Sequence, residues 1–171
     1  MPAAPVIDGL EFASSGQEAR GSVSVRDLGR LEDLLLDASG SLDYELKGTR
    51  DARNRPQVAL KVAGRLHLQC QRCLGLLDYS VNVANTLLVV PRDLTYVEEM
   101  DDPEAPDAIE ADPQLDVAGL IEDEVLLSLP LSPRHPEGAC AGRWGEHDGR
   151  DSKSAFAKLA ALKTDTNVKE Q

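Results

Sequence analysis

The sequence predicts an α+β fold in which an antiparallel sheet of four to five strands packs against two to three helices. Apolar and polar residues alternate through 42–46, 58–70 and 79–90, as they do in strands with one buried face. The loops between these segments are short, which favours antiparallel neighbours because a parallel pair needs a long crossover. Helical apolar spacing flanks the strands, at 25–38 and 116–129.

The residues before the sheet are expected to form a lead-in and one helix. Residues 1–21 are rich in Ala, Pro, Gly and Ser, which predicts a flexible N-terminal segment. Ser24 and Asp27 resemble a capping box, the hydrogen-bonded pair that begins many helices. Three leucines follow at helical spacing: Leu28, Leu31 and Leu35. Together these features predict an amphipathic helix over 25–38.

The sheet is predicted from the alternating segments in chain order. A strand at 42–46 is followed by a polar loop at 48–57 and then by the continuous apolar parity of 58–70. Gly64 interrupts this second segment, and either a hairpin turn or a bend in one long strand would accommodate it. A further strand over 79–90 leaves a tight turn between itself and the strand before.

A proline-rich acidic stretch separates the strands from the second helix. Residues 91–113 contain four prolines and few apolar side chains, so we expect a long exposed loop that is most acidic over 98–113. The pattern then predicts a helix over 116–129, which Pro130 ends.

The length and composition fit one folded domain, which we place at 22–140. The chain has 171 residues, of which 42% are hydrophobic, enough to bury a core. Residues 141–171 are expected to be a flexible tail that contains a short amphipathic helix at 154–163. The three cysteines are an odd number and cluster in part, which argues against a disulfide scaffold.

The net charge of −12 restricts the partners that the protein can bind. Twelve acidic residues and no basic residue lie between 98 and 124, so one segment carries the excess charge. Bulk attraction to nucleic acid is therefore excluded, and RNA contact would need a local basic patch. No segment approaches the ~18 apolar residues of a membrane helix, and the first residues lack a secretory pattern. We expect a cytoplasmic protein without membrane or DNA partners.

A metal site is predicted from the spacing of cysteine and histidine. Cys70 and Cys73 form a Cys-x2-Cys pair on the turn between two predicted strands, and zinc needs two further ligands to complete a tetrahedron. His135 and Cys140 are the candidates for the second pair. The alternatives are reduced thiols packed as small hydrophobic groups, or redox chemistry of the thioredoxin type.

A basic set on the predicted sheet is the candidate RNA-binding site: Arg50, Arg53, Arg55, Arg65, His67 and Arg72. The first three lie in the loop at 48–57 and the others along the strand that leads to the cysteine turn. Arginine side chains suit phosphate contacts and base stacking in RNA. The alternative is a solvated sheet face whose basic groups form surface ion pairs with Asp43 and Glu45.

Glu124 stands out in the second predicted helix because it faces the apolar stripe. A buried carboxylate needs a partner, since an unpaired buried charge costs several kcal/mol. Arg72 or Arg134 is the expected partner, and the alternative is a side chain that reaches solvent at the rim of the stripe. We treat Glu124 as a structural or functional carboxylate.

Three segments resemble the bacterial YceD family, described as large ribosomal RNA subunit accumulation proteins: LHLQCQRCLGLL (66–77), LDVAGLIEDEVLLSLPLSPRH (115–135) and FAKLAALK (156–163). The resemblance implies a role in 23S rRNA accumulation and large-subunit assembly, without an established catalytic activity. Relatives tend to carry a Cys, or a His and a Cys, after the Leu-Pro segment. A second cysteine before Cys140 is missing here, which excludes a site of four thiolates.

The residues and the resemblance together predict a function that is not enzymatic. No catalytic triad, P-loop, dinucleotide fingerprint or His-Glu-x-x-His motif occurs in the sequence. We expect a factor for large-subunit biogenesis that binds 23S rRNA or a precursor particle. The alternative is an acidic chaperone for a basic ribosomal protein, with the segment 98–116 as its docking region.

Overall fold

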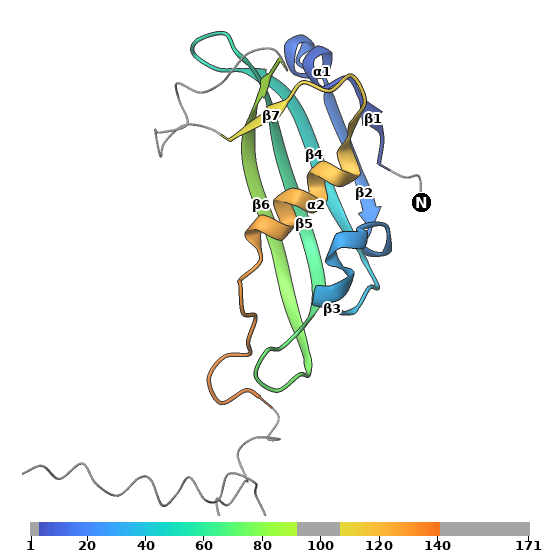
Figure 1. Ribbon diagram of the computed structural model, residues 1–171, viewed down its shortest axis with the longest axis vertical. Helices are drawn as coiled ribbons and strands as arrows, with labels where there is room; N and C mark the ends of the chain where they lie inside the picture. Colours follow the sequence, from blue (N-terminus) through green and yellow to red (C-terminus); the bar gives the residue numbers. More distant parts are fainter. Residues whose placement is uncertain (1–3, 92–106, 141–171) are drawn as a thin grey trace, which may run out of the picture.

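The computed structural model describes residues 4–91 and 107–140, which form a long twisted sheet covered on one face (Figure 1). The main sheet consists of β2 (Glu18–Ser24), β3 (Leu35–Asp37), β4 (Ser41–Arg50), β5 (Pro56–Gln69), β6 (Leu76–Val90) and β7 (Ala108–Glu110). The strand order is β2-β4-β5-β6-β7, and β3 also pairs with β5. All pairs are antiparallel except β6 with β7. The predicted α+β class is confirmed, but six strands exceed the four to five expected.

The three long strands β4, β5 and β6 carry the core face of the sheet. β5 is a single strand, because Gly64 pairs with Leu42 on one side and Val81 on the other. A Cβ at Gly64 would lie 2.6 Å from Leu42 Cδ2 and 3.0 Å from Ser41 O, so glycine permits close approach here and makes no turn. β6 begins at Leu76, earlier than the expected 79.

The helix α2 (Val117–Ser128) confirms the second predicted helix. The side chain of Asp116 accepts a hydrogen bond from the Ala118 N–H and caps the helix N-terminus. The helix crosses β5 and β6 (Figure 1) and buries a stripe of apolar side chains: Val117, Leu120, Ile121 and Val125. This stripe closes the hydrophobic core over the middle of the sheet.

The predicted helix over 25–38 is wrong. The segment forms two 3-10 turns, η1 (Val25–Asp27) and η2 (Gly29–Leu34), followed by β3, and Ser24 makes no side-chain capping bond. The buried side chains Val25, Leu28 and Leu31 are three residues apart, which matches the three-residue period of a 3-10 helix.

The prediction of a flexible lead-in over 1–21 is also wrong for the described residues. They form β1 (Val6–Ile7), α1 (Gly9–Ser15) and the start of β2, and β1 pairs with β8 (Leu115–Asp116). Phe12 is 3% exposed and packs over β4, where Gly48 leaves room. A Cβ at Gly48 would lie 2.2 Å from Phe12 O. The burial of Phe12 and its close contact with β4 give this segment a defined structure, although its content of Ala, Pro, Gly and Ser is typical of a flexible one.

The expected acidic loop is only partly a loop. β7 lies within the predicted interval 98–113, because Leu88 N–H donates to Asp107 O and Ala111 N–H donates to Val90 O, each at 2.8 Å. Residues 92–106 and the tail 141–171, with the expected helix at 154–163, lie outside the described residues. Within the described part, neither α-helix has the length or the apolar run that a bilayer crossing requires.

Candidate metal centre

The turn between β5 and β6 presents the first two cysteines, as predicted from their spacing. Cys70 N–H donates to Gly75 O at 2.9 Å, and Leu74 N–H donates to Cys70 O at 2.8 Å. Leu74 adopts a left-handed conformation with φ of 58°, which closes the turn tightly. Cys70 is fully buried and Cys73 is half-buried.

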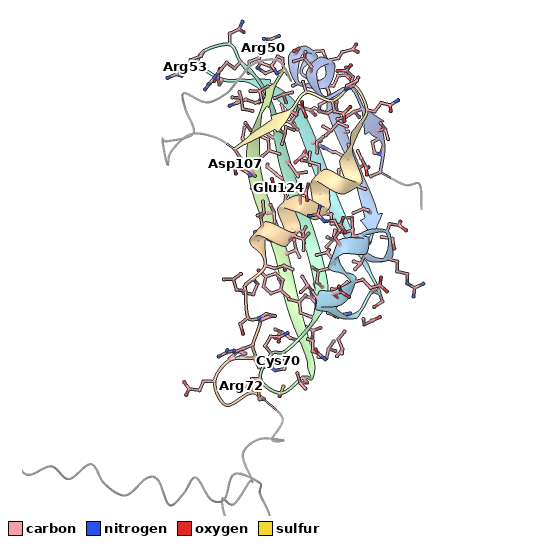
Figure 2. The ribbon with its side chains drawn as sticks, viewed as in Figure 1. Arg50, Arg53, Cys70, Arg72, Asp107 and Glu124 are labelled. Atoms are coloured by element: carbon pink, nitrogen blue, oxygen red, sulfur yellow. The ribbon has the colours of Figure 1, made fainter. Side chains whose placement is uncertain are left out.

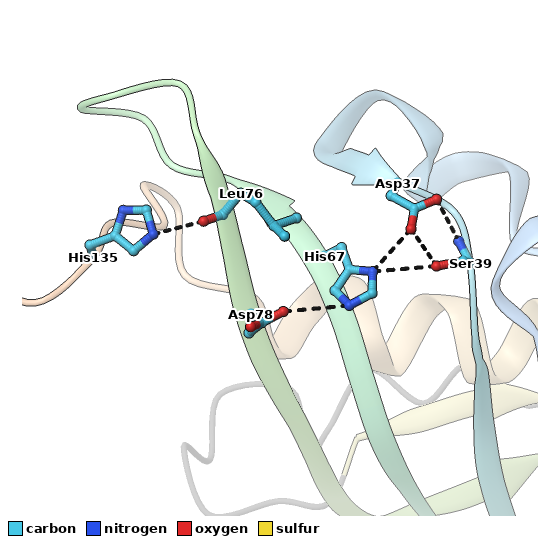
Figure 3. Close-up of polar contacts among 6 residues, drawn as sticks. All are labelled: Asp37, Ser39, His67, Leu76, Asp78 and His135. Atoms are coloured by element: carbon cyan, nitrogen blue, oxygen red, sulfur yellow. Dashed lines mark hydrogen bonds and ion pairs between the residues drawn. The ribbon is translucent and has the colours of Figure 1, made fainter. Parts of the chain in front are cut away.

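The segment that follows α2 brings the other two candidate ligands back to this turn. Gln71 N–H donates to Pro133 O at 2.8 Å, which fixes the segment against the turn. His135 Nε2 donates to Leu76 O at 2.7 Å (Figure 3). This bond fixes one proton on Nε2, so Nδ1, which faces the thiols, is the nitrogen that could bind a metal.

The four candidate ligand atoms lie within 4.8 Å of one another. Cys73 Sγ is 3.4 Å and Cys140 Sγ is 3.7 Å from His135 Nδ1, and Cys70 Sγ is 3.9 Å from Cys140 Sγ. Tetrahedral zinc, with bonds of about 2.3 Å to sulfur and about 2.0 Å to nitrogen, sets its ligand atoms roughly 3.5–3.8 Å apart. The observed spacing fits such a set of three thiolates and one imidazole.

The surroundings favour the thiolate form of Cys70. Burial raises the pKa of this thiol. Hydrogen bonds from backbone N–H groups of the turn and of His135 lower the pKa by more than burial raises it, so that it falls to about 5. Hydrogen bonding to Cys140 and to the Leu76 carbonyl raises the pKa of His135. The Gly75 N–H lowers the pKa of Cys73, yet burial and the neighbouring sulfurs leave it raised overall.

Arg72 is part of this centre. Its Nε donates to Cys140 Sγ at 2.9 Å, and its Nη2 donates to the carbonyls of His135 and Pro136 at 3.4 and 3.2 Å. Burial raises the pKa of the Cys140 thiol, but the bonds from Arg72 and His135 lower it overall. The guanidinium of Arg72 therefore stabilises the thiolate of Cys140 and is not the partner of Glu124.

The other candidate RNA-binding residues are not gathered into one patch. Arg50 ends β4, and Arg53 and Arg55 follow in the β4–β5 loop, at the end of the sheet opposite Arg72 (Figure 2). The 14 residues of β5 separate the two ends by about 45 Å, at about 3.3 Å per residue. Arg55 is paired with Asp51 at 2.6 Å. The predicted RNA-binding residues are therefore spread along the whole length of β5 and do not form one compact patch.

The uncovered face of the sheet carries both signs of charge. His67 lies between Asp37 and Asp78, at 3.3 and 3.4 Å (Figure 3). Glu45 pairs with Arg20 and with Lys61. Arg65 is exposed on this face and has no ion pair among the described residues. This face matches the alternative of a solvated surface with ion pairs more closely than an RNA-binding surface.

Glu124 is buried, at 7% exposure, but its partner is not an arginine. It accepts a hydrogen bond from Asn85 Nδ2 at 3.0 Å, and the same amide donates to Asp107 at 3.3 Å. Arg134 instead donates to Ser132 Oγ. The predicted pairing of Glu124 with Arg72 or Arg134 is wrong, and the alternative of a solvated rim position is wrong too.

Two polar residues of this region were missed in the sequence. Asn85 stands in the apolar parity of β6, between Val83 and Leu87, and this interruption was its only signal. Glu122 is 7% exposed and accepts a hydrogen bond from the backbone N–H of Arg30 at 2.6 Å, which joins α2 to η2. Nothing in the sequence pattern indicates that second contact.

Comparison with known proteins identifies the family. The family described as "Large ribosomal RNA subunit accumulation protein YceD" matches residues 58–163, which is more than half of the chain. The matched region contains most of β5, all of β6 and α2, and the four candidate metal ligands. No curated protein and no solved structure matches the chain significantly. The chain belongs to the YceD family of large ribosomal RNA subunit accumulation proteins.

Proposed function

We propose that this protein is a non-catalytic factor for biogenesis of the large ribosomal subunit, which promotes accumulation of 23S rRNA by binding the rRNA or a precursor particle. The family match over 58–163 is the observation that carries this proposal.

The β4–β5 loop is the surface that we assign to RNA phosphate. Arg50 donates to the carbonyls of Asn54 and Ser14, at 2.9 and 3.4 Å, and forms no ion pair among the described residues, so its charge is not neutralised. Arg53 is exposed beside it (Figure 2). Two arginines on one exposed loop suit contacts to the phosphate backbone, which position a protein without reading sequence.

Co-sedimentation with large-subunit precursors tests this surface. The double variant Arg50→Glu/Arg53→Glu is expected to leave the precursor fractions, because like charges repel phosphate. The matched control is Arg26→Glu, which reverses one exposed charge in η1 and is expected to co-sediment like the wild type. A double variant that stays with the precursors would show that the loop makes no essential RNA contact.

A second candidate function is that of an acidic chaperone for a basic ribosomal protein. The net charge of −12 supports it, as do the acidic side chains that flank β7, Asp107 and Asp112. Binding of a basic protein would then depend on this acidic region and fall with added salt. Deleting 98–112 is expected to abolish capture of that protein without affecting capture of precursor RNA.

We also propose that Cys70, Cys73, His135 and Cys140 bind one Zn²⁺ ion. Four protein ligands would complete the tetrahedron and leave no open position, which is typical of structural zinc. The ion would fix the segment after α2 to the β5–β6 turn, where one backbone bond, Gln71 N–H to Pro133 O, already joins them. Removal of zinc with a chelator is therefore expected to lower the Tm of the protein.

A further inference from the structure

Among the described residues, one long strand of the sheet has no partner strand along most of its outer side. β6 pairs with β5 from Leu76 to Leu88, but β7 pairs with it only from Leu88 to Val90. Among the described residues, no strand lies on the outer side of β6 between Asp78 and Thr86. In Figure 1, β6 forms the margin of the sheet below β7.

The hydrogen bonds at both ends of β6 show which backbone groups face this margin. Leu88 N–H and Val90 O bond to the chain around β7, and Leu76 O accepts from His135. Alternate residues of a strand direct their N–H and C=O to the same side. The backbone groups that point away from β5 therefore belong to Asp78, Ser80, Asn82, Ala84 and Thr86. All five residues are exposed, and only Thr86 N–H has a described partner, the Asn85 side chain.

This margin lacks the features that usually block strand addition. Natural edge strands carry lysine, proline or a bulge, or are very short. β6 contains no lysine, arginine or proline, and its pairing with β5 runs without a bulge. The opposite edge strand, β2, has the exposed charges Glu18 and Arg20. Small side chains at Ser80 and Ala84 leave the backbone of β6 open to approach.

The charges around the margin select a basic partner. Asp78 is the one charged residue of β6, and its side chain is 72% exposed. Asp107 lies at the other end, beside the start of β7 (Figure 2). Carboxylates at both ends of this margin attract lysine and arginine and repel phosphate at this edge of the sheet.

We propose that the free edge of β6, from Asp78 to Thr86, binds an extended Lys/Arg-rich segment of a partner protein as an added β-strand. Main-chain hydrogen bonds supply the binding, and the flanking carboxylates favour basic side chains. This inference rests on the second candidate function, that of a chaperone for a basic protein, and describes how such a partner is held. It does not depend on the RNA contact of the β4–β5 loop or on zinc.

Amide hydrogen exchange of the full chain tests the proposal with synthetic peptides. The probe is a ten-residue peptide of alternating lysine and valine. The controls are the same peptide with two central prolines, which cannot form a strand, and a peptide with glutamate in place of lysine. The lysine peptide is expected to slow exchange at Ser80, Asn82 and Ala84, and to leave Arg20 and Ser22 of the β2 edge unchanged.

Two edge variants complete the test. Ala84→Pro removes an outward N–H without breaking a bond to β5, and is expected to weaken peptide binding about tenfold; Ser22→Pro, on the β2 edge, is its matched control. Ala84→Lys adds a repelling charge and is expected to weaken binding even if the proline variant folds poorly.

Three outcomes would overturn the proposal. These are equal binding of the proline-containing peptide, protection of both sheet edges alike, and protection of the β6 amides by an RNA oligonucleotide but not by the lysine peptide. Capture of basic ribosomal proteins from cells separates this result from the broader function. If wild type and Ala84→Pro capture them equally, the chaperone function stands and the edge-binding inference fails.

Discussion

The Nε of Arg72 lies 2.9 Å from the Sγ of Cys140, so the guanidinium faces the candidate metal centre. Three thiolates and one neutral imidazole around Zn²⁺ leave a net charge of −1, which the charge of Arg72 balances. Partners of this kind, which contact the ligands and not the metal, typically change metal affinity by about 10–100-fold.

Arg72→Gln is therefore expected to weaken zinc binding by about tenfold or more. The measurement is competition with a chromophoric chelator, with Arg65→Gln as the control, because Arg65 lies on the uncovered sheet face. Charge reversal at Arg72 is therefore no test of RNA contact, since it would disturb the thiols first. Equal zinc affinity in the two variants would show that the Arg72–Cys140 contact does not stabilise the thiolate.

Zinc affinity is expected to rise with pH. In the metal-free protein the pKa values of Cys73 and His135 lie above their ordinary values, so both groups hold a proton that zinc must displace. Lowering the pH fills these positions with protons and weakens binding, and raising it removes them. Chelator competition from about pH 6 to about pH 8 checks the sign. Affinity that is constant over this range would contradict proton displacement at the site.

Asn85→Leu is expected to destabilise the fold, because it leaves the buried carboxylate of Glu124 without its donor. The expected loss in the free energy of unfolding at neutral pH is roughly 2–3 kcal/mol. Urea unfolding measures it, with the exposed Asn82→Leu as control. A similar loss in both variants would mean that the Asn85–Glu124 bond contributes little.

Gly48→Ala is expected to loosen the N-terminal helix from the sheet. The added Cβ would lie 2.2 Å from Phe12 O, which forces backbone movement and costs roughly 2–4 kcal/mol. Gly29→Ala is the control, because no atom lies within 4 Å of its added Cβ. Thermal unfolding compares the two. An unchanged Tm in Gly48→Ala would show that α1 contributes little to stability.

The sequence predicts well those elements whose apolar period is long and regular. The strands β4, β5 and β6 and the helix α2 each show such a period, and their caps and turns agree with it. The segment over 25–38 misled the prediction because residues three apart serve a 3-10 helix as well as one face of an α-helix. β1, α1 and β7 are short, and long-range pairing decides them more than local pattern does.

The candidate metal ligands were predictable and the buried polar contacts were not. Cysteine and histidine are few, and coordination geometry limits how they combine, so Cys70, Cys73, His135 and Cys140 could be grouped before their positions were known. The partner of Glu124 depends on how α2 crosses β6, which no local spacing records. The separation of the arginines, in contrast, follows from the 14 residues of β5 that lie between the two groups.

Metal content of protein purified without an affinity tag tests the Cys70–Cys73–His135–Cys140 centre most directly. The four ligand atoms within 4.8 Å of one another predict about one equivalent of zinc per chain. Cys140→Ser is expected to lose most of that zinc. The control variant Ala63→Ser, at an exposed position of β5 away from the centre, is expected to retain it. Less than about a tenth of an equivalent in the wild-type protein would contradict the account, because structural zinc sites are normally full.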